Sequence, residues 1–218
     1  MAITAVGSVV ANSGANTDTL AVSPVTVGDV LVFSFVSYGN TNSATVSGGG
    51  VTTWNTAYAN SGSGSLFGLW WGVVTIAGSA TITVTITNGG TINYLACQEF
   101  TTGGSTTWSI DGTAGSNYGS SFTSGVYPSK TSSQTVDEEL YVGNLFSVVG
   151  GVGGSTSGFT YESYLSGYGQ FCYSSSANTE TAQVPAFTKT SGWGFITSML
   201  LATTTVYVAT PTGLLDFF

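Results

Sequence analysis

The sequence contains no histidine and very few charged residues. Ser-His-Asp and Cys-His catalysis and histidine-based metal sites are therefore excluded within this chain. Only two residues are Lys or Arg, against ten Asp or Glu, which gives a formal net charge of −8. Nucleic-acid binding needs clustered Lys and Arg to displace counterions from phosphates. We therefore expect no nucleic-acid partner.

Long apolar runs and a cysteine framework are also missing. No stretch approaches the roughly 20 consecutive apolar residues that cross a bilayer, so we expect no membrane insertion. Residues 1–16 carry no positive charge, so we expect no secretory signal peptide in them. Cys97 and Cys172 are the only cysteines, and apolar or aromatic neighbours flank both. We expect two buried free thiols, with a single disulfide bond as the alternative.

What the chain has in abundance is glycine, hydroxyl-bearing residues and aromatic residues. Its 42% of hydrophobic and 13% of aromatic residues supply enough apolar material for a folded core. Because only 6% of the residues are charged, hydroxyl and amide groups must make the surface polar. Such a surface is typical of extracellular and virion proteins more than of cytosolic enzymes.

The strongest strand signal is the run GDVLVFSFVSY at 28–38. It is apolar on both faces, which predicts a central strand inside a layered β-structure. Alternation assigns its apolar side chains to two faces, Leu31, Phe33 and Phe35 on one and Val30, Val32 and Val36 on the other. The segment 137–149 has the same form, an acidic turn followed by an apolar strand, and predicts the equivalent strand of a second sheet.

Alternating or apolar segments predict the remaining strands, at 3–11, 18–23, 51–58, 65–75, 80–87, 93–102, 159–164, 167–174, 179–184 and 193–202. Segment 40–50 is predicted to be a polar loop that ends in a tight triple-glycine turn, and 103–133 a long loop with short edge strands. No segment has helical periodicity. The sequence therefore predicts an all-β, antiparallel β-sandwich, jelly-roll-like, as a single domain over 1–202.

An apolar ending follows this domain in residues 203–218. Leaving Leu214, Leu215, Phe217 and Phe218 in water would be costly. We expect this C-terminal tail to dock on a neighbouring subunit or partner; the alternative is that it packs on its own domain.

The chain offers few residues for chemistry. Glu99 and Glu162 are the best candidates for a carboxylate pair of the kind that hydrolyses glycosides. The alternative is that neither carboxylate is catalytic. Alternation with Cys97 is expected to turn Glu99 toward solvent, and Glu162 is expected to be a charge beside a loop. Asn12, Asn16 and Asp18 could supply oxygen ligands to calcium, although Asn and Asp are also common turn residues. We expect no enzyme activity, no metal and no cofactor.

Aromatic side chains provide the remaining candidate site. Trp and Tyr rings stack on sugars and fill protein interfaces, because they combine a broad apolar face with a polar edge. The candidates for a glycan or partner surface are Trp54, Tyr58, Trp70, Trp71 and Trp108, with only one of the adjacent pair Trp70 and Trp71 facing outward. Packing in the core is the alternative explanation for each of them.

The strings GDVLVFSFVSY, VSGGGVTTWNTAY, LFGLWWGVVTIAGSATITVTI, CQEFTTGGSTTWSIDGTAG, DEELYVGNLFSV, GSTSGFTYESY and WGFITSMLLA resemble modules of bacteriophage minor tail and other virion proteins, and domains of bacterial surface proteins. The resemblance covers most of residues 20–202 and includes no catalytic signature. It implies a non-enzymatic β-sandwich in a virion, with copies of itself and other virion proteins as partners and a host-surface glycan as a further one. The sparse Lys and Arg and the apolar tail depart from the resemblance.

Two functional interpretations follow from these observations. In the first, the chain is a structural virion subunit, a tail-tip or fibre component that is assembled in the host cytoplasm. In the second, it is an extracellular or cell-surface protein, either a glycan-binding module or the subunit of a filament. Binding to a glycan that is lost on substitution of Trp54 or Trp108 would favour the second interpretation.

Overall fold

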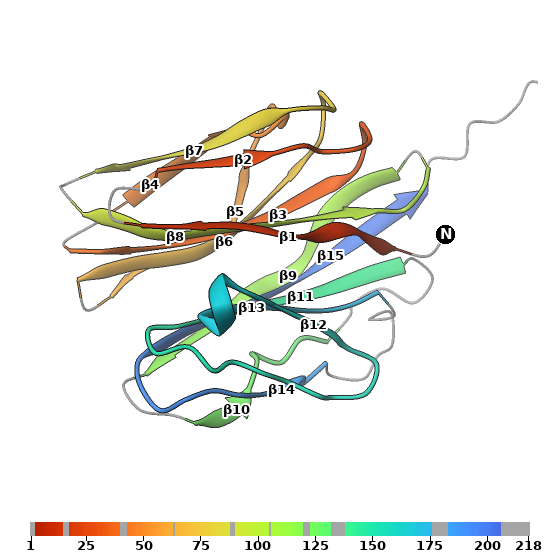
Figure 1. Cartoon of the computed structure of the whole chain (residues 1–218). Coiled ribbons are helices and arrows are strands. Elements are labelled where there is room, and N and C mark those ends of the chain that lie inside the picture. The colour runs from red at the N-terminus through yellow and green to blue at the C-terminus, as the bar shows by residue number, and fades with distance from the viewer. Residues whose placement is uncertain are drawn as a thin grey trace, which may run out of the picture.

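Antiparallel strands make up nearly all of the regular secondary structure among the described residues (Figure 1). The computed structural model describes residues 3–14, 18–39, 43–62, 64–87, 90–104, 106–119, 123–131, 138–175 and 183–205. The elements are β1 (Thr4–Ser13), β2 (Thr19–Val22), β3 (Val30–Tyr38), β4 (Ser43–Gly48), β5 (Asn55–Gly62), β6 (Ser65–Val73), β7 (Ala80–Thr87), β8 (Thr91–Thr101), β9 (Thr106–Gly119), β10 (Ser124–Val126), β11 (Glu138–Ser147), β12 (Thr160–Tyr164), the short 3-10 helix η1 (Leu165–Gly167), β13 (Gly169–Ser174), β14 (Ala186–Thr188) and β15 (Gly194–Thr205).

Two five-stranded sheets form the sandwich. The first sheet has the order β1-β8-β3-β6-β5, and the second has the order β12-β13-β11-β15-β9. Each sheet is built from one half of the chain, and every neighbouring pair of strands in it is antiparallel. The predicted all-β antiparallel sandwich is confirmed. Among the described residues no helix is long and apolar enough to span a membrane.

Smaller layers cover the outer faces of both sheets. The three-stranded sheet β2-β7-β4 lies on the first sheet, and the β10-β14 pair lies on the second (Figure 1). Apolar side chains fill each of the interfaces between these layers. The inner strands are therefore buried on both faces, which explains why their sequences are apolar runs and not alternating patterns.

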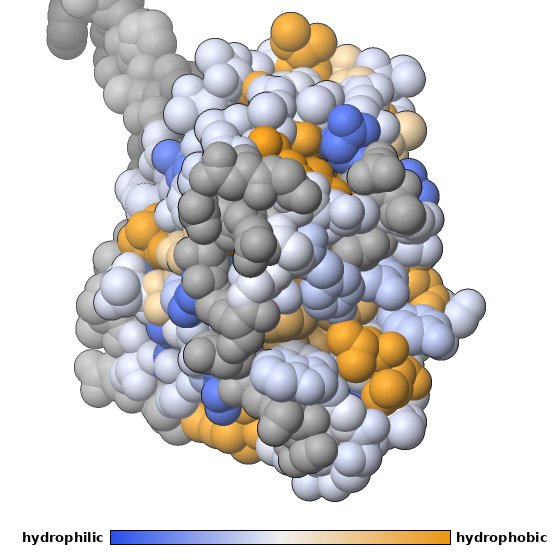
Figure 2. All heavy atoms as spheres, turned by 90° about the vertical axis from the view of Figure 1, so that its left-hand side faces the viewer, coloured by the Kyte–Doolittle hydropathy of each residue, from blue (hydrophilic) through white to orange (hydrophobic). Residues whose placement is uncertain are grey.

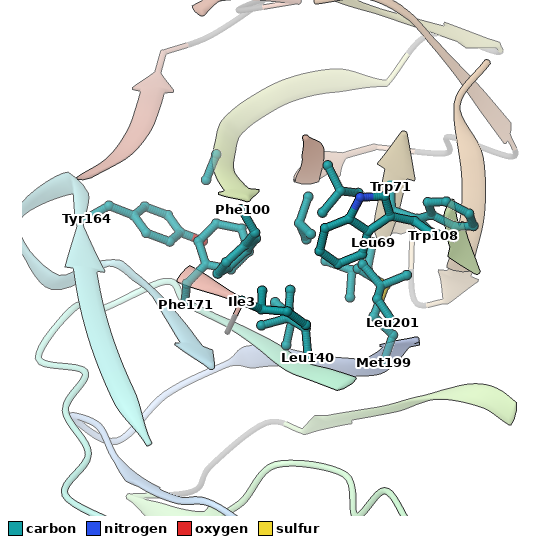
Figure 3. Close-up of a cluster of buried hydrophobic side chains, with 14 residues drawn as sticks. Ile3, Leu69, Trp71, Phe100, Trp108, Leu140, Tyr164, Phe171, Met199 and Leu201 are labelled. Atoms are coloured by element: carbon teal, nitrogen blue, oxygen red, sulfur yellow. The ribbon is translucent and has the colours of Figure 1, made fainter. Parts of the chain in front are cut away.

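The central strands β3 and β11 face each other across the main core, as the sequence predicts. Val30 and Val32 of β3 pack with Leu140 and Val142 of β11 in the cluster shown in Figure 3. Leu31, Phe33 and Phe35 pack on the opposite side, under the three-stranded sheet. The predicted division of this strand into two apolar faces is therefore confirmed.

A polar bridge joins the same two strands inside the core. The hydroxyl of Ser34 on β3 donates to Asn144 Oδ1 on β11 at 3.0 Å, and Asn144 Nδ2 donates to the Tyr164 hydroxyl at 2.8 Å. All three side chains are buried. Because buried polar groups are costly without partners, the bridge favours one alignment of the two sheets over others.

Two predicted loops are strands. Residues 106–119 form β9, an edge strand of the second sheet along β15, where the sequence predicted loop with short edge strands. Residues 43–48 form β4, which pairs with β7. Both strands are rich in glycine and hydroxyl residues and bury one face only, through Trp108, Ile110 and Ala114 or through Ala44 and Val46. The predicted turn of Gly48, Gly49 and Gly50 is confirmed, since all three have positive φ angles.

The last strand extends further than predicted. Residues 203–205 continue β15 and pair with β9, so the strand does not end at Ala202. The tail residues Leu214, Leu215, Phe217 and Phe218 lie outside the described residues, and their docking stays a prediction.

Candidate functional site

Three of the five predicted surface aromatics are core residues. Trp70 packs under the three-stranded sheet, and Trp71 and Trp108 pack between the two large sheets (Figure 3). The expectation that one of Trp70 and Trp71 faces outward is wrong, because β6 has a covering layer on each side. Trp108 donates its indole N–H to the Gly28 carbonyl at 2.9 Å, which satisfies the one polar group that it buries.

The other two predicted aromatics are half-buried and lie in different clusters. Trp54 packs edge-on against Phe33 with a centroid distance of 5.8 Å and donates to the Gly48 carbonyl. Tyr58 packs against Phe67, and its hydroxyl accepts a hydrogen bond from Asn60. The five predicted residues therefore form no common surface.

A different set of aromatics lines a pocket at one end of the sandwich. Its volume is about 290 Å³, and its lining includes Tyr38, Ser65, Val148, Trp193 and Phe195. The strands β3 and β11 end there, while β6 and β15 begin there. This is the left-hand end in Figure 1, and Figure 2 views it front on, with hydrophobic side chains in patches among polar ones. The pocket thus opens where the two large sheets meet at their ends.

Trp193 is the exposed member of this pocket. All five tryptophans lie in described residues, and Trp193 alone is exposed, at 42%. Its loop is fixed by the buried Lys189, whose Nζ donates to the carbonyls of Thr190 and Gly192 at 2.8 and 2.6 Å. The Val148 N–H also donates to the Trp193 carbonyl at 3.1 Å. These bonds hold the backbone on both sides of the ring, so the ring is presented on an ordered loop.

Tyr38 supplies a polar atom to the same pocket. It is the last residue of β3 and pairs with Ser65, the first residue of β6. Its hydroxyl is buried and has no hydrogen-bond partner among the residues that the structure describes. Burial, with the nearby Tyr94 as a smaller cause, raises the pKa of Tyr38 well above its ordinary value, so the phenol stays neutral and able to donate.

Sequence reasoning missed this site because its residues are far apart in the chain. Trp193 reads as the first apolar residue of a strand, and nothing local distinguishes it from a core tryptophan. The one local signal is Ser191-Gly192 before it, which indicates a turn that could lift the ring out of the sheet.

Glu99 and Glu162, the predicted carboxylates, hold separate places in the fold. Glu99 is 8% exposed, so the expectation that it faces solvent is wrong. Its Oε1 accepts the Val25 N–H at 2.8 Å, which ties the loop after β2 to the first sheet. Burial raises the pKa of Glu99; hydrogen bonds from the backbone of Val25 and Thr26 oppose this, and the adjoining carboxyl of Asp29 adds to it.

Glu162 lies within β12 and not beside a loop, which corrects the second expectation. Its carboxylate accepts the Val9 N–H of β1 at 3.1 Å and the Tyr173 hydroxyl at 2.7 Å. It therefore joins the edges of the two large sheets. Glu99, by contrast, binds the loop that contains Val25. The two carboxylates therefore make separate structural contacts and do not form a pair.

No metal centre is evident in the parts of the chain that the structure describes. They contain no group of three or more His, Cys, Asp or Glu that could hold an ion. Asn12 lies near the end of β1, where its amide donates to the carbonyl of Thr19 at the start of β2 and its Oδ1 accepts the N–H of Ser13. Asn16 lies outside the described residues. Cys97 and Cys172 are buried free thiols, as the sequence predicts.

Comparison with known proteins adds no relative: no family model, curated protein or solved structure matches the chain.

Proposed function

We propose that the chain is a non-enzymatic structural protein of a virion, a bacteriophage minor tail, tail-tip or fibre component that contacts other virion proteins and the host surface. The proposal extends the resemblance of residues 20–202 to virion modules. The observation that carries it is the layered stack of antiparallel sheets, whose layers are packed together by continuous apolar clusters.

The polar chemistry of the described residues supports the same interpretation. Both predicted carboxylates are bonded to backbone groups of other strands or loops, and both thiols are buried. Burial raises the pKa of Cys97 above its ordinary value, and Glu99 beside it raises this pKa further, so the thiol is held in its unreactive protonated form. The carboxylates join elements of the fold and the thiols are held unreactive in its core, as would suit a structural part.

The test is whether the chain is a stoichiometric part of a particle. Virions are purified from the culture that produces the chain, analysed by quantitative mass spectrometry and labelled with gold-tagged antibody against the purified protein. We expect a fixed copy number per particle and labelling at one position, and particles from a strain that lacks the coding sequence give the control. Particles with the full set of other proteins and none of this chain would contradict the proposal.

A glycan-binding surface module is the second candidate. The pocket lined by Tyr38 and Trp193 favours it, because an exposed tryptophan on an ordered loop beside an unpartnered hydroxyl is an arrangement suited to recognition.

A further inference from the structure

We infer that the end pocket, meaning the pocket lined by Tyr38, Ser65, Val148, Trp193 and Phe195, binds the uncharged pyranose ring of a glycan. In the proposed virion subunit this pocket would make the contact with the host surface, so its biological meaning rests on that function. The binding chemistry itself depends on the pocket alone.

The charge of the pocket selects a neutral ligand. Its described lining contains no Asp, Glu, Lys or Arg. The chain carries a net charge of −8 and only two basic residues. Both are engaged with backbone carbonyls, Lys130 with that of Thr113 and Lys189 with those of Thr190 and Gly192. Sialylated or sulfated sugars would therefore be repelled by the overall field, with no cation at the pocket to bind them.

The shape and polarity of the pocket suit a sugar ring. The exposed indole of Trp193 and the buried ring of Phe195 offer apolar surface to the C–H face of a pyranose. Tyr38 and Ser65, paired across β3 and β6, bring two hydroxyls to the same end of the sandwich. The volume of about 290 Å³ is at the lower end of the range for small-molecule sites.

Tyr38 provides the sharpest argument for a ligand. A buried hydroxyl without a partner destabilises the free protein. The hydroxyl is covered in the free protein, so the Tyr38 side chain has to turn toward the pocket on binding before a sugar hydroxyl can satisfy this group. Apolar ligands would leave it unsatisfied, which favours a polyhydroxylated ligand over a purely hydrophobic one.

The loop that carries Trp193 is organised before any ligand arrives. Lys189 is 4% exposed, and its backbone N–H donates to the Thr123 carbonyl at 2.8 Å. Its ammonium bonds fix the turn on one side of Trp193, and the Val148 N–H fixes the carbonyl of Trp193 itself. Little conformational entropy is then lost on binding, which raises affinity for a weakly contacted ligand.

The experiment combines a glycan array with titration in solution. The purified full chain is applied to an array of neutral, sialylated and sulfated glycans. It is then titrated with the methyl glycosides of glucose, galactose, mannose and N-acetylglucosamine while tryptophan emission is recorded. Because Trp193 is the only exposed tryptophan, a ligand that covers it shifts the emission to shorter wavelength.

We expect retention of neutral glycans only, and an emission shift with at least one glycoside. Trp193→Ala should weaken binding by about tenfold or more, and Trp193→Phe by less. Tyr38→Phe should weaken binding by about three- to tenfold while leaving the melting temperature unchanged or higher, because the hydroxyl has no partner in the free protein. If Trp193→Ala does not fold, Tyr38→Phe and Trp193→Phe still decide the question.

Matched controls lie outside the pocket lining. Ile76→Ala removes a side chain that is 70% exposed beyond the far end of β6, and Tyr161→Phe removes a hydroxyl that donates to the Ala186 carbonyl. Neither should change the affinity. Three results would overturn the site: no neutral glycan bound, binding unchanged in both pocket variants, or self-association of the chain that Trp193→Ala abolishes. Each can occur while the chain is still found in virions, so failure of the site is distinguishable from failure of the proposed function.

Discussion

Replacing Asn144 with alanine tests whether the polar bridge between the central strands stabilises the sandwich. Asn144 accepts the Ser34 hydroxyl hydrogen at 3.0 Å and donates to the Tyr164 hydroxyl at 2.8 Å. The exposed fractions of Ser34, Asn144 and Tyr164 are 4%, 5% and 8%, so water reaches them poorly. The substitution removes a partner from two buried hydroxyls at once.

The magnitude follows from those two groups. Each buried hydroxyl left without a partner costs about 1–3 kcal/mol. A contact between Ser34 and Tyr164 recovers part of this loss. We therefore expect Asn144→Ala to lower the free energy of unfolding by about 2–4 kcal/mol, which is a large share of the roughly 5–15 kcal/mol typical of a domain.

The assay is urea unfolding followed by tryptophan fluorescence, with the m-value compared between variants. Asn117→Ala is the matched control, since Asn117 is exposed on the edge strand β9 and its loss should change stability by less than about 0.5 kcal/mol. A double-mutant cycle with Ser34→Ala should give a coupling energy of about 0.5–1.5 kcal/mol. Equal effects of Asn144→Ala and Asn117→Ala, or strict additivity with Ser34→Ala, would refute the reasoning.

Three further predictions concern other parts of the chain. Because burial raises the pKa of Glu99 in the folded state, its contribution to stability is complete below the ordinary value of 4.5 and is lost as the pH rises through the folded value. Glu99→Gln should remove this pH-dependent loss of stability, which thermal melts between pH 4 and 8 would measure. A melting temperature that depends on pH in the same way in the variant and the wild type would contradict the prediction. Cys97 and Cys172 should react with a thiol reagent only when the protein is denatured. Mass spectrometry of the denatured, non-reduced protein should then count two labels per chain, and labelling of the native protein would contradict the prediction. Deleting residues 214–218 should weaken self-association measured by analytical ultracentrifugation without lowering the melting temperature, and an unchanged oligomer would count against a docking tail.

Strands buried on both faces could be predicted from the sequence because their burial leaves a local trace. The run at 28–38 and its counterpart at 137–149 carry apolar side chains on both faces of the strand. They form the facing strands β3 and β11. Edge strands leave a weaker trace. In β9 only alternate positions touch the core, and small or hydroxyl residues occupy the others, so the segment looks like a loop until β15 is placed beside it.

The candidate site was less predictable than the fold, because exposure is decided by what lies opposite a side chain. In the sequence, Trp71 and Trp193 look alike, because both are aromatic residues in apolar segments. The second sheet covers the first of them, and a turn fixed by Lys189 exposes the other. The exposure of a polar residue is equally hard to predict from the sequence. Alternation alone places the Glu99 carboxylate in solvent, but the loop that contains Val25 folds back over it.

The location of any recognition site follows from what the layers leave uncovered. The three-stranded sheet and the β10-β14 pair cover the outer faces of the two large sheets. The lateral edges are also occupied, because β1 lies against β12 and β5 against β9. At the first of these edges the Glu162 carboxylate takes the Val9 N–H that an added strand would otherwise use. The faces and lateral edges of the two large sheets are thus committed to the fold, and the ends of their strands remain. At one end the chain leaves a tryptophan exposed and a tyrosine hydroxyl without a partner, and both lie in the same pocket. Asp29 and Gln98 also bury an oxygen that has no hydrogen-bond partner among the described residues, so Tyr38 is distinguished by its place in the lining of a pocket that holds an exposed tryptophan.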